Sequence, residues 1–352
     1  MTDRLDPYHR RRRRGRTPEP MPARAGGGRR GDTFVVQEHH ARRLHWDFRL
    51  ERDGVLVSWA VPKGLPTHPD QNRLAVHTED HPLEYGSFEG EIPTGEYGAG
   101  RVIIWDSGTY ETEKWSDREV KVVLRGKRVS GRYVLFQTRG DDWMVHRMDP
   151  PDDPDFEPLP GELDPMRPVR RRALPEEAAA YGYEFAWPGL RALAYVEGGR
   201  VRLVAGGGDV TSTYPEVRGL GAAFGSRAVL LDGVIVALDE GGRPSEEALR
   251  RRRDAGGSRS AQRRNPVTYV AFDVLHLDGR PTADRSYAER RRLLDSLDLR
   301  GPYWQAAPWF EGDGDAVARA ARDQGMPGVV AKRLDAPYRP ARRSMSWIEV
   351  AT

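Results

Sequence analysis

The 352-residue sequence predicts a multidomain protein in which an all-β domain, a barrel or a sandwich, precedes an α+β domain. Residues 33–149 hold short β-branched and aromatic runs separated by clusters of Gly, Pro and Asp, which is typical of folds built from many short strands. Residues 150–180 are rich in Pro and Asp, as linkers are. From residue 181 onward, strand patterns mix with helical ones, which indicates an α+β domain.

The expected elements follow from these patterns in chain order. In the first domain, strands are expected at residues 33–36, 44–50, 55–60, 73–77, 101–105, 120–124, 133–137 and 143–146. In the second domain, residues 181–352, strands are expected at 191–196, 200–204, 228–238 and 267–274, and helices at 287–297 and 315–324.

Charge is distributed unevenly along the chain. The first 50 residues carry 13 arginines and six acidic residues, although the net charge of the chain is only +3. Residues 1–32, with an arginine run at 10–14, are expected to form a basic flexible arm that buries no core. An arginine excess is typical of a protein that binds a nucleic acid. The alternative is a basic tail that reflects an arginine-rich, lysine-poor composition.

Composition excludes several classes of site. The chain has no cysteine, which rules out disulfides, thiol nucleophiles and cysteine-ligated zinc, so a metal must be bound by histidines and carboxylates. No apolar run reaches the length of a membrane span, and no apolar segment follows the basic residues at the N-terminus. We therefore expect a cytoplasmic, nucleoid-associated protein.

Six of the nine histidines lie between residues 39 and 81. In the expected strand 44–50, strict alternation places His45, Asp47 and Arg49 on one face. Imidazole and carboxylate groups bind divalent ions, and an adjacent guanidinium suits a phosphate oxygen. His39, six residues upstream, could supply a third ligand. The alternative is the solvated polar face of an ordinary strand.

Further polar groups follow this strand at short intervals. Lys63 and Arg73 could hold phosphate oxygens, Glu79 lies close by, and His81 could donate to a leaving oxygen. The alternative for each of these residues, taken alone, is an ordinary position on the protein surface.

Residues 33–148 resemble the 3′-phosphoesterase domain of bacterial DNA ligase D. The resemblance is carried in order by FVVQEHHARRLHWDFRL, SWAVPKGLP, NRLAV, TEDHPLEYGSFEGEIPTGEYGAGRVIIWDSGTY and GRYVLFQT. It implies a β-barrel that removes 3′-phosphates and 3′-ribonucleotides from DNA ends, with a manganese-type ion. By motif position it implies metal binding by His39, His45 and Asp47, phosphate contact by Arg49 and His81, and a site lined by Lys63, Arg73, Glu79 and Tyr85.

One position departs from the family pattern. The family's arm carries an acidic residue a few positions before the TPEP motif, and the equivalent here is Arg13, while Glu19 is kept. The arm acids support ribonucleotide removal more than phosphate removal, so this sequence puts ribonucleotide removal in question.

Residues 181–352 resemble the nucleotidyltransferase domain of ATP-dependent DNA ligases. The resemblance is carried by YEFAWPGLRALAYVEGGRVRLV, LLDGVIVALDEGGRPS, YVAFDVLHLDGR and MPGVVAKRLDAPYRPARRSMSW. Ala186 occupies the position of the nucleophilic lysine, Pro188 that of an acid and Val234 that of a glutamate. Lys332 is kept and is the only lysine after Lys127. Because nucleotidyl transfer needs a lysine amine, we expect a pseudo-ligase that does not use ATP.

The leading hypothesis is therefore a metal-dependent 3′-phosphoesterase, with manganese as cofactor, joined to a non-catalytic ligase-like domain in which Phe272 and Trp347 keep a packing role. The alternatives are a non-catalytic DNA-binding scaffold and an active DNA ligase. The family further implies, as partners, DNA 3′ ends, a Ku-type end-binding protein and separate polymerase or ligase chains.

Overall fold

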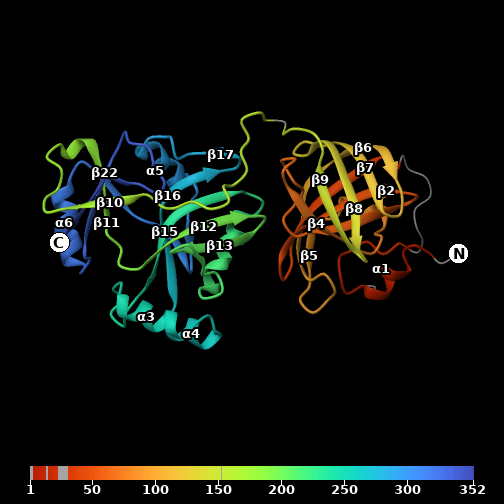
Figure 1. Cartoon of the computed structure of the whole chain (residues 1–352). Coiled ribbons are helices and arrows are strands. Elements are labelled where there is room, and N and C mark those ends of the chain that lie inside the picture. The colour runs from red at the N-terminus through yellow and green to blue at the C-terminus, as the bar shows by residue number, and fades with distance from the viewer. Residues whose placement is uncertain (1–2, 13–14, 23–30, 152) are drawn as a thin grey trace. The chain divides into compact units, whose positions relative to one another are not determined.

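The structure is a computed structural model that describes residues 3–12, 15–22, 31–151 and 153–352. Figure 1 draws the whole chain. The chain divides into two units, Met1–Phe156 and Glu157–Thr352. Among the described residues, no helix has the length and apolarity needed to cross a membrane.

An antiparallel β-barrel forms the first unit (Figure 1). The described strands close it in the order β1-β2-β3-β4-β9-β8-β7-β6, and β6 returns to pair with β1 while β5 extends the sheet beside β6. The strands are β1 (Thr33–His40), β2 (Leu44–Arg52), β3 (Val55–Val61), β4 (Asn72–His77), β5 (Gly90–Ile92), β6 (Gly100–Trp115), β7 (Glu119–Arg125), β8 (Ser130–Arg139) and β9 (Asp142–Arg147). The predicted all-β fold is confirmed as a barrel, and β5 is a strand that the sequence did not predict.

Strand β2 shows how alternation builds the barrel core. Trp46, Phe48 and Leu50 are at most 1% exposed and pack inside the barrel with Trp59 of β3 and Leu135 of β8. Burying a side chain of this size stabilises the fold by roughly 1.5–3 kcal/mol. Because successive side chains on a strand alternate between faces, the same packing turns the polar residues of β2 to the outer face of the barrel.

The expectation that residues 1–32 bury no core is wrong for their described part. Helix α1 (Asp6–Arg11) has a proline in its first turn and basic residues in its last turn, which favours a helix despite its short length. Leu5 packs in the barrel core, and Tyr8 packs in a second apolar cluster; both side chains are 0% exposed. Two apolar residues one helical turn apart are enough to dock the segment.

The second unit contains two sheets. One has the order β14-β13-β12-β15-β16-β19-β18, with β17 beside β16, and the other has the order β10-β22-β21-β11-β20. The strands are β10 (Arg167–Arg171), β11 (Tyr181–Phe185), β12 (Leu190–Glu197), β13 (Arg200–Ala205), β14 (Gly208–Asp209), β15 (Val229–Ala237), β16 (Val267–Leu277), β17 (Arg280–Pro281), β18 (Arg300–Gly301), β19 (Trp304–Ala306), β20 (Trp309–Glu311), β21 (Gly328–Arg333) and β22 (Arg343–Ala351).

Helices flank these sheets, so the α+β prediction is confirmed. Two predicted helices are present as α5 (Tyr287–Ser296), which begins with a capping box, and α6 (Gly314–Asp323). The sequence did not predict the short helices α2 (Gly219–Phe224), α3 (Glu246–Asp254) and α4 (Arg259–Arg264), which are rich in Gly or Arg and offer little apolar periodicity. Single 3-10 turns form η1 (Leu83–Ser87), η2 (Ala178–Ala180) and η3 (Pro215–Arg218).

The predicted linker at residues 150–180 is mostly part of the second unit. Strand β10 lies in this segment and pairs in parallel with β22. Met166 is fully buried, and Leu159 and Leu163 pack against the same cluster. Proline excludes a helix but not an extended strand at a sheet edge, so a proline-rich segment can still contribute a strand to a domain.

Candidate functional site

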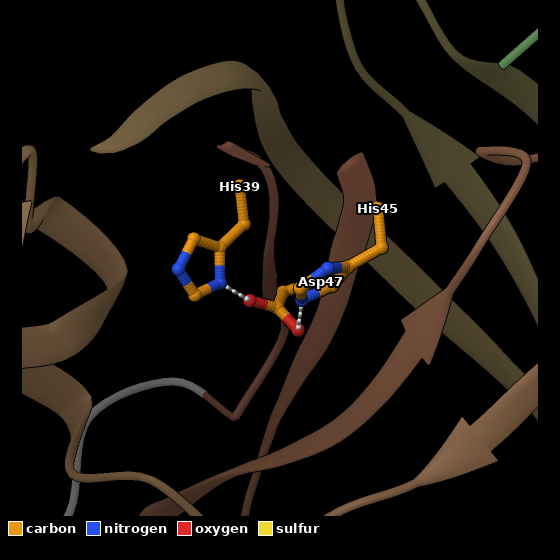
Figure 2. Close-up of side chains that lie close together, drawn as sticks. All are labelled: His39, His45 and Asp47. Atoms are coloured by element: carbon orange, nitrogen blue, oxygen red, sulfur yellow. Dashed lines mark ion pairs between the residues drawn. The ribbon is translucent and has the colours of Figure 1, made fainter. Parts of the chain in front are cut away.

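The hairpin of β1 and β2 brings together three residues predicted to bind a metal. In the antiparallel register, His39 lies directly opposite His45, and Asp47 follows two residues later on the same face of β2. Figure 2 shows the three side chains pointing toward one another. Their donor atoms all lie within 4.8 Å of one another. A single ion can therefore contact all three residues.

Backbone carbonyls determine which nitrogen of each imidazole can bind an ion. The Nε2 atom of His39 lies 2.8 Å from the Gly98 carbonyl oxygen, and the Nδ1 atom of His45 lies 3.0 Å from the Arg43 carbonyl oxygen. Because a carbonyl only accepts, these nitrogens carry the protons. In a neutral ring, the unprotonated nitrogens are then His39 Nδ1 and His45 Nε2, 3.5 and 3.7 Å from Asp47. This donor set suits a borderline divalent ion.

Arg49 lies beside this cluster and is itself buried. Its Nη2 lies 3.1 Å from Asp47 Oδ2, its Nε donates to Gln37 at 2.8 Å, and its Nη1 donates to Ser58 at 2.8 Å. Burial would raise the pKa of Asp47, but the positive charge of Arg49 outweighs it and holds that pKa well below its usual value. Asp47 is only 6% exposed and Arg49 only 2%, so this is not the solvated face of an ordinary strand.

His81 lies next to Arg49, where its backbone bridges to Leu56 of β3. Its Nδ1 lies 2.8 Å from the Glu79 carbonyl oxygen and 2.9 Å from Arg49 Nη1, and its Nε2 lies 3.3 Å from Arg12 Nη2. Burial and the two guanidinium groups hold the pKa of His81 well below its usual value. At neutral pH the ring is therefore uncharged.

The other cation next to His81 comes from the N-terminal segment. Arg12 pairs with Glu19 at 2.8 Å and with Glu79 at 2.9 Å, and its guanidinium lies 3.9 Å from the centre of the Tyr8 ring. Tyr8 in turn packs edge-on against His81. The segment around α1 therefore forms one wall of the site. Arg12 is 8% exposed, which is low for a residue in a run of arginines.

Two further predicted residues lie in this wall. Tyr85 is buried, and its hydroxyl donates to Glu19 at 3.1 Å while its ring lies under the Arg49 guanidinium. Burial raises the pKa of Tyr85 well above its usual value, so the hydroxyl stays protonated. The Glu79 carboxylate accepts from Arg11 and Arg12, so it orients the arm and reaches His81 through Arg12.

The structure places Lys63 and Arg73 at the edge of this arrangement. Val61 of β3 pairs with Trp46, the neighbour of His45, so Lys63 lies near the His45 end of β2. Arg73 donates to the carbonyl oxygen of Lys63 and, at 3.1 Å, to Gln71. Arg13, where the family pattern has an acid, lies outside the described residues.

Several residues of the site were missed in the sequence. Gln37 and Ser58 carry a signal that was available, because Gln37 precedes His39 by two residues on β1 and Ser58 is the polar residue within the apolar run of β3. Arg12 and Tyr8 carry no such signal, because nothing in the local sequence distinguishes Arg12 from the arginines around it. Gly98 contributes through its carbonyl oxygen, which sequence patterns do not reveal.

In the second unit, the residues at the positions of the expected nucleotide site differ from one another in burial and in contacts. Ala186 follows β11, and its amide donates to the Gly328 carbonyl oxygen at 2.9 Å. Pro188 is partly exposed before β12, and Val234 is buried in β15. Lys332 of β21 is 2% exposed, and its Nζ donates to Glu184 at 2.8 Å.

Aromatic rings surround this lysine. Its Nζ lies 4.2 Å from the ring centre of Phe272 and 4.3 Å from that of Trp347, which confirms that both rings are buried and packed. The guanidinium of Arg191 lies over the same two rings and forms a two-point pair with Asp232. Burial lowers the pKa of Lys332, while Glu184 opposes that effect.

Two family models match the chain. The model of the DNA ligase D 3′-phosphoesterase domain matches residues 37–137, and the model of the ATP-dependent DNA ligase domain matches residues 168–350. These regions correspond to the barrel and to most of the second unit.

Relatives match over nearly the whole chain. The multifunctional non-homologous end joining protein LigD of Mycobacterium bovis is 46% identical over 357 residues, which cover 99% of this chain and 45% of that protein. The LigD protein of Pseudomonas aeruginosa is 36% identical over 405 residues, 98% of this chain and 47% of that protein. The chain thus spans slightly less than half the length of these relatives.

A solved structure of mycobacterial DNA ligase D, complexed with ATP and MES, matches with a TM-score of 0.48 and 34% identity over 54% of this chain and 60% of that chain. The sequence resemblances to both domain families are confirmed by the family models. The chain belongs to the ATP-dependent DNA ligase domain family, its residues 37–137 match the DNA ligase D 3′-phosphoesterase domain, and it is similar to LigD proteins over nearly its whole length.

Proposed function

We propose that the first unit is a metal-dependent phosphoesterase that hydrolyses 3′-phosphates at DNA ends during double-strand-break repair by end joining. The observation that carries the proposal is the convergence of two imidazole nitrogens and the Asp47 carboxylate beside the buried Arg49. The match to a 3′-phosphoesterase domain and the relatives named for non-homologous end joining support DNA ends as the substrate.

His39, His45 and Asp47 would hold the divalent ion, which we propose to be Mn²⁺. When bound, such an ion supplies Lewis-acid stabilisation of negative charge on a phosphoryl oxygen. The reaction is hydrolysis: water adds to phosphorus, the bond to the 3′ oxygen breaks, and a 3′-hydroxyl and inorganic phosphate result.

Two fixed cations, Arg49 and Arg12, favour a phosphoryl group beside His81. The Arg49 Nη2 atom carries two hydrogens, of which Asp47 accepts one, and the other can be donated to a phosphoryl oxygen. Gln37 and Ser58 hold this guanidinium in place, so little reorganisation is needed in the transition state. Because the Nδ1 proton of the uncharged His81 ring is directed at the Glu79 carbonyl oxygen, its Nε2 is unprotonated and can accept a proton.

We limit the proposal to phosphate removal. The family's second reaction, removal of a 3′-ribonucleotide, depends more on the arm acids, and one of these positions is Arg13 here.

The test is to incubate the protein with Mn²⁺ and a DNA duplex that bears a 3′-phosphate. We expect release of inorganic phosphate by the wild-type protein and none by His45→Ala. If the wild-type protein binds this duplex tightly but releases no phosphate, the non-catalytic scaffold becomes the better hypothesis.

We further propose that the second unit keeps the ligase fold without ATP-dependent nucleotidyl transfer. Ala186 has no heteroatom that can attack a phosphate, and Lys332 is buried in an ion pair with Glu184. We expect no covalent label after incubation with α-labelled ATP, with an intact DNA ligase as the positive control. A labelled Lys332 would make the chain an active nucleotidyltransferase.

The relatives are named multifunctional non-homologous end joining proteins. From this family resemblance we propose that the chain works in the cytoplasm, at the nucleoid, with a Ku-type end-binding protein and with separate polymerase and ligase chains. Retention of such an end-binding protein on the same DNA end in a gel-shift experiment is the expected result.

A further inference from the structure

The loop between β5 and β6 presents an exposed aromatic ring at the edge of the proposed phosphoesterase site. Tyr97 is 46% exposed, which is unusual for a ring of this size beside a largely buried cluster. The residue that follows it, Gly98, accepts the hydrogen bond from His39 Nε2 at 2.8 Å. The backbone that carries Tyr97 is therefore tied directly to the metal-binding cluster.

The other side of Tyr97 contacts the N-terminal segment. Arg11 Nη1 donates to the Tyr97 hydroxyl at 2.6 Å, and the Arg11 and Arg12 guanidinium carbons lie 5.1 and 5.4 Å from its ring centre. Arg12 is the residue whose Nη2 lies 3.3 Å from His81. Tyr97 is thus linked to His39 through Gly98 and to His81 through Arg12, so it lies at the rim of the site.

The backbone conformation of the loop restricts where the Tyr97 ring can lie. Gly98 has φ +75°, and Gly100 has φ +138° with room for no side chain, because a Cβ there would lie 2.3 Å from the His40 carbonyl oxygen. The contact with Arg11 holds the hydroxyl end of the ring. A rigid aromatic ring at a solvent-facing rim is a stacking surface that loses little entropy on binding.

We propose that Tyr97 is a base-binding platform, on which the nucleobase of the 3′-terminal nucleotide stacks while its phosphate lies at Arg49 and His81. This rests on the proposed function of the first unit. Every nucleobase offers a π-face, so stacking serves an enzyme that must accept any terminal base.

A different role for Tyr97 is only to anchor the N-terminal segment through Arg11. The two roles make different predictions about the substrate. A stacking platform discriminates between a terminus with a base and a terminus without one, whereas an anchor affects both termini equally. Duplexes that end in a 3′-phosphate on an ordinary nucleotide or on an abasic tetrahydrofuran residue separate these cases.

The experiment measures the Kd of both duplexes by fluorescence anisotropy without added metal, so that no turnover occurs, for wild type, Tyr97→Ala, Tyr97→Phe and Phe136→Ala. Phe136, 37% exposed on β8, is the matched exposed aromatic of the same unit. We expect wild type to bind the duplex with the terminal base about tenfold more tightly than the abasic one. Tyr97→Ala should lose this preference, and Tyr97→Phe and Phe136→Ala should keep it.

The proposal is overturned if wild type binds both duplexes equally, if Tyr97→Ala weakens both by the same factor, or if Tyr97→Phe behaves like Tyr97→Ala. Phosphate release with Mn²⁺ is measured in parallel on both duplexes. Because the binding comparison needs no catalysis, a wild-type protein that discriminates but releases no phosphate would remove the proposed activity and keep the base platform.

Discussion

The two units both bury charged side chains, but they balance the charges differently. In the first unit, unprotonated nitrogens of two histidines face the Asp47 carboxylate, with Arg49 at the side. In the second unit, several cations meet a buried carboxylate at hydrogen-bond distance, as in the pairs Lys332–Glu184, Arg191–Asp232 and Arg290–Asp273. An added cation stabilises lone pairs that point toward one another. A buried ion pair already contains its counter-charge and requires no bound ion.

This difference indicates what each region does. Removing a histidine donor from the first cluster should cost function and little stability, because an isosteric replacement keeps the packing of the hairpin and the Asp47–Arg49 pair. Removing a partner from the second network should cost stability and no function, because it leaves an uncompensated charge in the interior. Variants of the two regions therefore test the comparison directly.

The largest effect is expected from Asp47→Asn. Loss of the anionic ligand should lower phosphate release about a thousandfold, since metal stabilisation of the transition state contributes several kcal/mol and each 1.4 kcal/mol is tenfold. Calorimetric titration with Mn²⁺ should show weakened binding in parallel. The matched control is His68→Ala, since this histidine of the same unit lies outside the cluster. Equal loss in both variants would argue against a specific site at His39, His45 and Asp47.

Next in size is the effect of Lys332→Ala on stability. Breaking this buried pair should lower the free energy of unfolding of the second unit by about 3 kcal/mol, because Glu184 is left buried without its cation. Native-state hydrogen exchange reports each unit separately. Phosphate release should not change. Arg300→Ala, which removes an exposed ion pair of the same unit, should change stability by less than about 1 kcal/mol.

If Lys332→Ala left the stability of the second unit unchanged and abolished a covalent ATP label, the comparison would fail. The second unit would then hold a functional site in the same sense as the first.

The barrel and the proximity of His39, His45 and Asp47 were predictable because their signals are local. Alternation along β2 identifies both the core face and the polar face, and the hairpin register explains why His39, six residues from His45, lies directly opposite it. The family resemblance added roles for residues such as Arg49 and Tyr85. Their exact hydrogen-bond partners depend on the fold and were not predictable.

The N-terminal arm and the linker were misjudged because their packing partners lie far away in sequence. Nothing around Tyr8 or Met166 indicates an apolar cavity elsewhere in the chain, so bulk composition suggested segments without a core. The same reasoning failed for Arg12, whose partner Glu79 is 67 residues away. Long-range pairing decides these positions, and local patterns carry no information about it.

A smaller effect is expected from Arg12→Lys. Lysine keeps the charge but cannot pair with Glu19 and Glu79 while it also reaches His81, because it lacks the planar, forked guanidinium. Phosphate release should fall about tenfold, with the stability of the barrel unchanged. Arg10→Lys, an exposed neighbour in the same run, is the matched control and should retain full activity. Unchanged activity in Arg12→Lys would mean that the segment around α1 only covers the barrel.

The smallest effect concerns pH and His81, which, unlike the structural pairs of the second unit, is hydrogen-bonded to no carboxylate among the described residues. Its pKa is held well below the ordinary value of about 6.5, by burial and then by Arg49 and Arg12.

Below pH 6.5 the unfolded chain therefore takes up a proton that the folded barrel does not, so stability falls as the pH falls. At pH 5.5 this lowers the free energy of unfolding by on the order of 1 kcal/mol relative to neutral pH. Hydrogen exchange of the barrel at pH 7.5 and 5.5, corrected for intrinsic rates and measured with EDTA, should show this dependence in wild type and a reduced one in His81→Asn. An equal dependence in both proteins would mean that His81 is not held neutral by the two guanidinium groups.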